Sequence, residues 1–179
     1  YIKGGQGEGV VANAKHYAAN FQDYNRHKVS SNMDERTLHE IYLPAFKTAV
    51  KEGGVGTVMT SYNLINGVHA SENDYLINKV LKGEWGFNGF VMSDWVSTYN
   101  GVACAKAGLD IEMPSAKHMA PDTLLQAIKS GQISEKMIDE KISRILTVYK
   151  QYGFLDNANI ARGYKFDKGL SRTVAINEA

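Results

Sequence analysis

Several classes of protein are excluded by what this sequence lacks. Of its 179 residues only Cys104 is a cysteine, which rules out an internal disulfide framework and a cysteine-based zinc site. The net charge of +1 leaves no basic field of the kind that nucleic-acid-binding proteins carry. No apolar run reaches the ~18 residues that a membrane-spanning helix needs. With 44% hydrophobic and 22% charged residues, the composition is that of a globular domain with its own core.

Short apolar runs alternate along the chain with longer amphipathic segments. Strands are expected at 10–16, 55–61, 89–94 and 109–113, where the runs are short and largely apolar. Helices are expected at 34–52, 73–82, 98–107, 121–130 and 134–152, where apolar residues recur every three or four positions. The Gly-rich residues 1–9 are expected to form a loop. Repeated strand–helix units with buried strands predict an α/β fold with a parallel sheet.

The number of these units predicts an incomplete architecture. Four of them make the C-terminal half of a (β/α)8 TIM barrel, because a full barrel takes ~200 residues or more. A half barrel has two open sheet edges, which are unfavourable alone. We therefore expect residues 1–153 to combine with further protein, on the same original chain or another one. The irregular residues 154–179 are expected to be a linker toward a second domain.

Polar and aromatic residues follow every predicted strand, at the edge where parallel α/β folds carry their active sites. These groups are Lys15-His16, Ser61-Tyr62-Asn63, Ser93-Asp94-Trp95 and Glu112-Met113. A strand that ends on an aspartate holds the carboxylate rigidly, and a neighbouring tryptophan offers a flat face on which a sugar ring stacks. This pairing suggests covalent chemistry on a carbohydrate.

Taken in order, the motifs resemble those of glycoside hydrolase family 3, the family of many β-glucosidases, over about residues 8 to 155. They are Ala14-Lys15-His16-Tyr17, Asn25-Arg26, Met59-Thr60-Ser61-Tyr62-Asn63 and Glu84-Trp85-Gly86-Phe87-Asn88-Gly89-Phe90-Val91-Met92-Ser93-Asp94-Trp95. The resemblance implies the second half of the family's N-terminal barrel domain. It also implies that the first half of that barrel, and an α/β sandwich domain, complete the enzyme.

The resemblance further implies a role for each motif in hydrolysis of terminal non-reducing β-D-glucosyl, or related β-glycosyl, residues with retention. Asp94 is the implied nucleophile, and Tyr62 is the residue that orients it. The residues implied to contact the terminal sugar are Lys15, His16, Arg26, Met59, Tyr62 and Trp95. The acid/base is implied to come from a part outside this chain.

Two features separate this chain from other branches of the family, and one departs from the usual pattern. No Pro-Gly-His loop follows Lys15-His16, which argues against the branch that cleaves N-acetylglucosamine. Trp95 stands where the xylosidase-like branch often has cysteine, which favours a glucosidase-like interpretation. The usual Gln-Glu before Asn-Arg is Gln22-Asp23 here, and the shorter acid alters a supporting contact.

Each site residue also has a structural alternative that the sequence leaves open. Asp94 fits a helix N-cap, and Lys15 fits an ion pair with Asp23 or Asp94. His16 fits a core histidine whose hydrogen bonds are satisfied. Tyr62 fits a tyrosine packed at a loop, and Trp95 fits a core tryptophan. Glu112 lies on the same edge, and we expect it to support the rim rather than act as the acid.

No metal or organic cofactor is expected, because both steps of the retaining mechanism are carboxyl chemistry. The remaining histidines show no metal-ligand spacing. The expected partners are a β-glucoside or oligosaccharide, the rest of the barrel and a second α/β domain, with neither nucleic acid nor membrane. Two other functions stay open: a sugar-binding module that has lost catalysis, and a metal-dependent aldolase or isomerase. The compartment is not fixed, although secretion or a periplasmic location is favoured over the cytoplasm.

Overall fold

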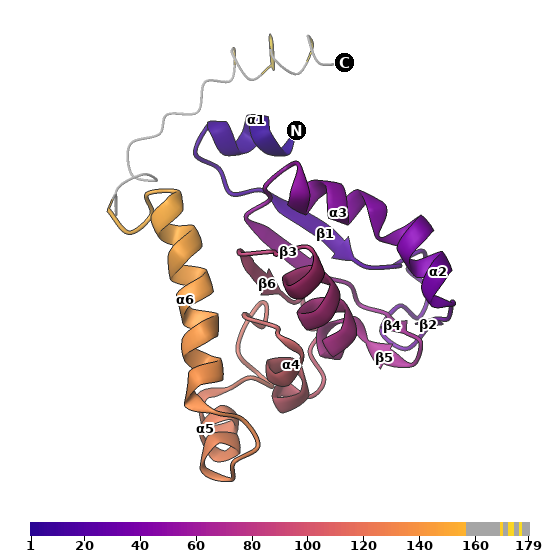
Figure 1. Ribbon diagram of the computed structural model, residues 1–179, viewed down its shortest axis with the longest axis vertical. Helices are drawn as coiled ribbons and strands as arrows, with labels where there is room; N and C mark the ends of the chain where they lie inside the picture. The colour runs from indigo at the N-terminus through magenta and orange to yellow at the C-terminus, as the bar shows by residue number, and fades with distance from the viewer. Residues whose placement is uncertain (157–168, 170–171, 174–175, 177–179) are drawn as a thin grey trace.

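The computed structural model describes residues 1–156, 169, 172–173 and 176 (Figure 1). Its centre is a parallel sheet in the order β1-β3-β6, made by Asn13–Tyr17, Thr57–Thr60 and Phe90–Met92. The strands stand in register with Ala14 beside Val58 and Val58 beside Val91. Val58 and Val91 have no exposed surface. The predicted α/β fold with a buried parallel sheet is therefore confirmed.

Helices surround this sheet. In Figure 1, α3 runs beside β1 and α6 stands on the side of β6, while α4 and α5 lie beyond the β6 edge of the sheet. The α-helices are α1 (Ile2–Gly7), α2 (Glu35–Thr37), α3 (Pro44–Lys51), α4 (Gly101–Ala107), α5 (Pro121–Lys129) and α6 (Glu135–Gln151). Wider or tighter helical turns form η1 (Leu38–Tyr42), η2 (Ala70–Glu72) and η3 (Tyr75–Glu84). None of the helices in the described part of the chain is long and apolar enough to cross a membrane.

The helix expected over 34–52 begins and ends where predicted but is interrupted. Asp34 caps it, because its carboxylate accepts a hydrogen bond of 2.6 Å from the Thr37 amide. The regular turns widen into the π-helical η1, and α3 then restarts at Pro44. Proline has no amide hydrogen and fits the first turn of a helix, so it begins a new segment instead of continuing the old one.

Two expectations at other places were wrong in detail. Residues 1–9 were expected to be a loop, yet Ile2–Gly7 form α1. This short helix is attached by Gln6, whose side chain donates to Gly54 O at 3.0 Å and accepts from Gly56 N at 2.9 Å. The strand expected at 109–113 is reduced to one parallel bridge between Met92 and Ile111. On either side of that bridge a main-chain amide donates to a side chain: the Val91 amide to Asp110 and the Met113 amide to Ser93. The main-chain pairing of a longer strand therefore does not form.

A second, small sheet has no counterpart in the sequence analysis. It consists of β2 (Ser30–Ser31), β4 (Leu64–Ile65) and β5 (Val68–His69), in that order. The turn between β4 and β5 is Asn66-Gly67, and both residues have positive φ, at 50° and 84°. An Asn-Gly pair between apolar residues is the strongest short-range hairpin signal, so this turn was readable in the sequence.

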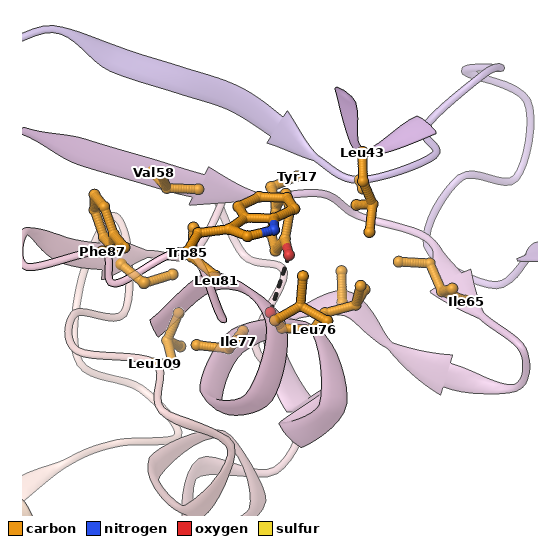
Figure 2. Close-up of a cluster of buried hydrophobic side chains, with 14 of the residues drawn as sticks. Tyr17, Leu43, Val58, Ile65, Leu76, Ile77, Leu81, Trp85, Phe87 and Leu109 are labelled. Atoms are coloured by element: carbon orange, nitrogen blue, oxygen red, sulfur yellow. Dashed lines mark hydrogen bonds between the residues drawn. The ribbon is translucent and has the colours of Figure 1, made fainter. Parts of the chain in front are cut away.

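The core lies between the sheet and η3 (Figure 2). Tyr17, at the end of β1, is fully buried and donates a hydrogen bond of 2.9 Å to the Leu76 carbonyl. Its ring meets Phe46 and Trp85 edge to face, with centroids 5.1 and 6.0 Å apart. Because η3, α3 and β1 all contribute to this contact, the core fixes the end of β1 from which the predicted site residues extend.

Helix α6 does not bury the apolar face that its sequence predicts. Ser134 caps it, accepting from the Met137 amide at 3.2 Å. Ile142 and Leu146, which the apolar periodicity of the segment would place inward, are 47% and 46% exposed, whereas Lys141 is only 6% exposed. Tyr149 is exposed as well. The helix is therefore rotated relative to the expectation, because Lys141 rather than Ile142 faces η3 and α4. Beyond α6, most of the expected linker at 154–179 lies outside the described residues.

Candidate active site

Asp94 lies just beyond the carboxyl end of β6 and is 7% exposed. Its Oδ1 accepts a hydrogen bond of 2.7 Å from the amide of Trp95. Its Oδ2 lies 3.3 Å from Nε2 of His16, which belongs to β1 two strands away. The Asp94 carbonyl accepts from the hydroxyls of Ser93 and Ser97, at 2.9 and 3.0 Å. Main chain and side chain of Asp94 are thus both held in place.

Tyr62 follows the end of β3, is 8% exposed and lies near the same carboxylate. Burial raises the pKa of Tyr62, and the nearby Asp94 carboxylate raises it further, while the Arg26 charge opposes them. The Arg26 guanidinium lies over the Tyr62 ring at 4.1 Å from its centre. Arg26 also forms an ion pair of 2.9 Å with Asp23, the residue where the expected glutamate is shortened. Aspartate therefore still reaches the arginine.

The other predicted site residues are not all drawn into this contact network. Lys15 is exposed on β1, and within the described residues it has no ion pair, so the alternative pairing with Asp23 or Asp94 is not formed. Met59 is buried on β3, at 5% exposure. Trp95 is 47% exposed, so the alternative that it belongs to the core is wrong. Its indole is available at the surface beside the Asp94 carboxylate.

Glu112 has a structural task, as the sequence analysis expects. Its carboxylate accepts hydrogen bonds from the amides of His118 and Met119, the shortest of them 2.6 Å. These contacts close the loop that follows the Met92–Ile111 bridge. With its oxygens engaged by the main chain, Glu112 supports the rim of the sheet.

Two histidines that appeared scattered in the sequence gather behind Tyr62. The ring of His27 packs against Tyr62 with centroids 4.5 Å apart, and its Nδ1 lies 2.8 Å from the Tyr99 hydroxyl. His69 stacks on Tyr99 at 3.8 Å. Tyr62 is thereby enclosed by Arg26 and His27, which are adjacent in the chain. In the sequence, its position next to Arg26 is the feature that indicates a place for His27 near the site. No local pattern predicts that Tyr99 or His69 lies there.

The arrangement has the properties that nucleophilic attack by a carboxylate requires. A carboxylate offers about four lone-pair positions, and the observed contacts of Asp94 leave part of that capacity unused. The Trp95 amide and His16 Nε2 hold its two oxygens in a fixed orientation. Among the described residues no group of three metal-ligating side chains is suitably placed for a metal ion.

Comparison with known proteins assigns the same region of sequence to one family. Residues 1–148 match the family model described as "Glycosyl hydrolase family 3 N terminal domain". A β-glucosidase of Rhizobium radiobacter is 44% identical over 158 residues, which are 88% of this chain and 19% of that protein. The chain spans about a fifth of the length of the curated relatives it matches.

Solved structures agree with this assignment. A family 3 β-glucosidase of Bifidobacterium adolescentis superposes with a TM-score of 0.88 at 38% identity, covering 97% of this chain and 25% of that one. β-Glucosidase 3B of Thermotoga neapolitana, in complex with glucose, gives a TM-score of 0.82 at 41% identity, covering 87% of this chain and 23% of that one.

Proposed function

The chain belongs to glycosyl hydrolase family 3, and from this premise we propose that it carries the nucleophile and part of the sugar site of a retaining β-glucosidase. The substrate is a terminal non-reducing β-D-glucosyl or related β-glycosyl residue. The names of the relatives support this choice, since those compared above are β-glucosidases.

The environment of Asp94 is the observation that carries the proposal. This carboxylate is nearly buried just beyond the end of β6, and it is held by the Trp95 amide at 2.7 Å and by His16 at 3.3 Å. Beside it stands the half-exposed Trp95, a surface on which a sugar ring stacks. A fixed carboxylate next to an open aromatic surface suits attack on an anomeric carbon.

In the proposed reaction, a carboxylate oxygen of Asp94 forms a bond to the anomeric carbon as the glycosidic C–O bond breaks. The departing oxygen takes a proton from a separate acid, and the sugar stays attached to Asp94 as an ester. Water, deprotonated by the same acid/base, then attacks the anomeric carbon and releases Asp94. The two displacements together retain the configuration. We propose that the acid/base comes from a part of the enzyme outside this chain.

The remaining site residues bind the sugar in this proposal. Lys15 and Arg26 donate hydrogen bonds to sugar hydroxyls, and His16 does so while holding Asp94. The Tyr62 hydroxyl sets the direction of the Asp94 carboxylate. Met59 and Trp95 form the apolar walls. No metal or organic cofactor takes part, because every step is a carboxyl or proton-transfer step.

The same reasoning assigns a larger context to the chain. We propose that residues 1–153 are the C-terminal half of a TIM barrel and that 154–179 lead to a second α/β domain. The edge of the sheet at β1 and the exposed apolar residues of α6 support this, since both are surfaces that a folded protein ordinarily covers.

Trapping of the covalent intermediate tests the proposal. The complete protein is incubated with a 2-fluoro-β-glucoside bearing a good leaving group, and its peptides are analysed by mass spectrometry. We expect a fluoroglucosyl label on the peptide that contains Asp94, and no label in Asp94→Asn. Asp122→Asn, a change of an exposed carboxylate on α5, is the matched control and should label normally. A label on another residue would refute the assignment of the nucleophile.

A further inference from the structure

A cavity of about 180 Å³ lies away from Asp94, between η3, α4 and α6. Four cationic side chains line it: Lys82 from η3, Lys106 from α4, and Lys141 and Arg144 from α6. Only two carboxylates, Asp110 and Glu140, oppose them. The cavity therefore has an excess of positive charge, and its volume is well beyond what one water molecule needs.

The carboxylate of Asp110 is fully engaged by partners other than Lys141. Both of its oxygens lie 3.0 Å from the Lys82 ammonium, and Oδ2 also accepts from the Val91 amide at 2.7 Å. Lys82 donates in addition to the Gly108 carbonyl. Lys82 and Asp110 thus neutralise each other as a buried pair, which leaves Glu140 as the other carboxylate at the cavity for the three remaining cations.

Lys141 is the exception in this cluster. It is 6% exposed and lines the cavity, yet within the described residues its ammonium has neither a hydrogen-bond acceptor nor an ion-pair partner. Glu140 is directed outward, with a side chain that is 62% exposed and lies 3.9 Å from Lys136. The Lys141 side chain is largely withdrawn from solvent, and its ammonium reaches the cavity without a counter-charge, so the cavity is suited to one negative group.

Arg144 offers donors at the same place. One of its terminal nitrogens donates to the carbonyls of Phe87 and Gly89, at 2.9 and 3.2 Å. These bonds fix the guanidinium beside the amino end of β6. A guanidinium has five N–H donors, so others are left for a ligand. A planar fork next to an ammonium is a combination that matches oxyanions.

We propose that this cavity is a binding site for a small oxyanion of the sulfate or phosphate class, held between Lys141 and Arg144. The anion supplies the negative charge that the protein does not provide there. Lys106 at the rim adds attraction for an entering anion. The site is separate from the proposed sugar site, because Asp94 follows the carboxyl end of β6 and Arg144 binds the segment before its amino end.

Calorimetric titration of the complete protein with sodium sulfate at pH 7, against sodium chloride at matched ionic strength, tests the proposal. We expect saturable binding of one sulfate that Lys141→Met weakens at least tenfold. Lys136→Met removes an exposed lysine of the same helix and should bind like the unchanged protein. Circular dichroism checks folding, and Lys141→Gln serves if the methionine variant does not fold.

Raising the pH tests the proposed sulfate site independently. Burial lowers the pKa of Lys141 to about 8. The charges of Lys82 and Arg144 also lower this pKa, while those of Asp110 and Glu140 oppose the shift. Sulfate keeps its charge in this range, so binding should weaken about tenfold between pH 7 and pH 9.5. Absence of saturable binding, equal binding by Lys141→Met, or binding unchanged at pH 9.5 would each overturn the proposal. Hydrolysis of an aryl β-glucoside is expected to continue in Lys141→Met, so this result does not depend on the proposed function.

Discussion

Asp94 and Asp110 stand near opposite ends of β6, and both are 7% exposed, yet their surroundings differ. Asp110 accepts from Lys82 with both oxygens and from the Val91 amide, and its side chain has no exposed surface. Asp94 has one short hydrogen bond from a main-chain amide and a longer contact to His16. Burial alone therefore does not distinguish a structural carboxylate from the one proposed to be the nucleophile.

What separates the two residues is the use of their lone pairs. The oxygens of Asp110 are occupied by donors of the same chain, so this carboxylate holds η3, β6 and the following segment together. The Asp94 carboxylate is oriented but keeps unused acceptor capacity. Its neighbours, Trp95 and the exposed Lys15, face outward, where a ligand is free to approach. The comparison predicts activity defects at one end of β6 and stability defects at the other.

The largest expected effect tests the reactive end. Asp94→Asn should lower turnover of an aryl β-glucoside in the complete protein by ~10⁴-fold or more, since it removes the proposed covalent nucleophile. Glucose affinity, measured by calorimetry, should change little, because the amide has the same shape. If the variant keeps its turnover, Asp94 is not the nucleophile. If the unchanged protein binds glucose but hydrolyses nothing, the sugar-binding module is the correct interpretation.

The next effect tests the structural end. Asp110→Asn should lower the free energy of unfolding by ~3–5 kcal/mol, because Lys82 is left buried without its counter-charge. Glu40→Gln breaks the exposed pair of Arg36 and Glu40 and is the matched control, with at most ~1 kcal/mol expected. Urea unfolding of the complete proteins measures both. Equal losses of unfolding free energy in the two variants would contradict the expected difference between the buried pair and the exposed pair.

A pH-dependent difference should follow from Lys141. Its pKa in the folded protein is about 8, below the ordinary value of 10.5, so the unfolded chain binds more protons between these values. The free energy of unfolding, lowered below pH 8, therefore rises as the pH increases toward 10.5, by at most ~3.4 kcal/mol. Subtracting the unfolding free energies of Lys141→Met isolates this rise. In sulfate the rise should shrink, because the bound anion already compensates the charge.

The smallest effect refines the assignment of Tyr62. Tyr62→Phe removes a donor to a charged group worth ~1.5–3 kcal/mol, so kcat should fall by about 10- to 100-fold. The ring under Arg26 is kept, and the fold should be unaffected. Tyr99→Phe removes a hydroxyl that contacts His27 rather than Asp94, and its loss should be smaller. A larger loss in Tyr99→Phe would mean that the His27 contact matters more than the direct one.

Local patterns were sufficient for much of the fold. The strands at β1, β3 and β6, the helices α5 and α6, and the caps at Asp34 and Ser134 follow from apolar periodicity and capping residues. The helix break at Pro44 was also readable, since proline cannot continue a hydrogen-bonded turn. The helix α1 was not predicted, because its glycines oppose helix formation. The contacts of Gln6 with a turn far along the chain hold this helix in place.

By itself, the sequence determined the strands of the central sheet, most of the helices around it and their order, because these depend on neighbours within a few positions. It thereby indicated the edge at which Asp94, Tyr62 and His16 meet. Only the tertiary structure decided which groups touch: His16 rather than Lys15 beside Asp94, and Lys141 rather than Ile142 in the cavity of α6. Such contacts depend on how whole helices and strands are rotated and packed, and residues far apart in the chain set that rotation together.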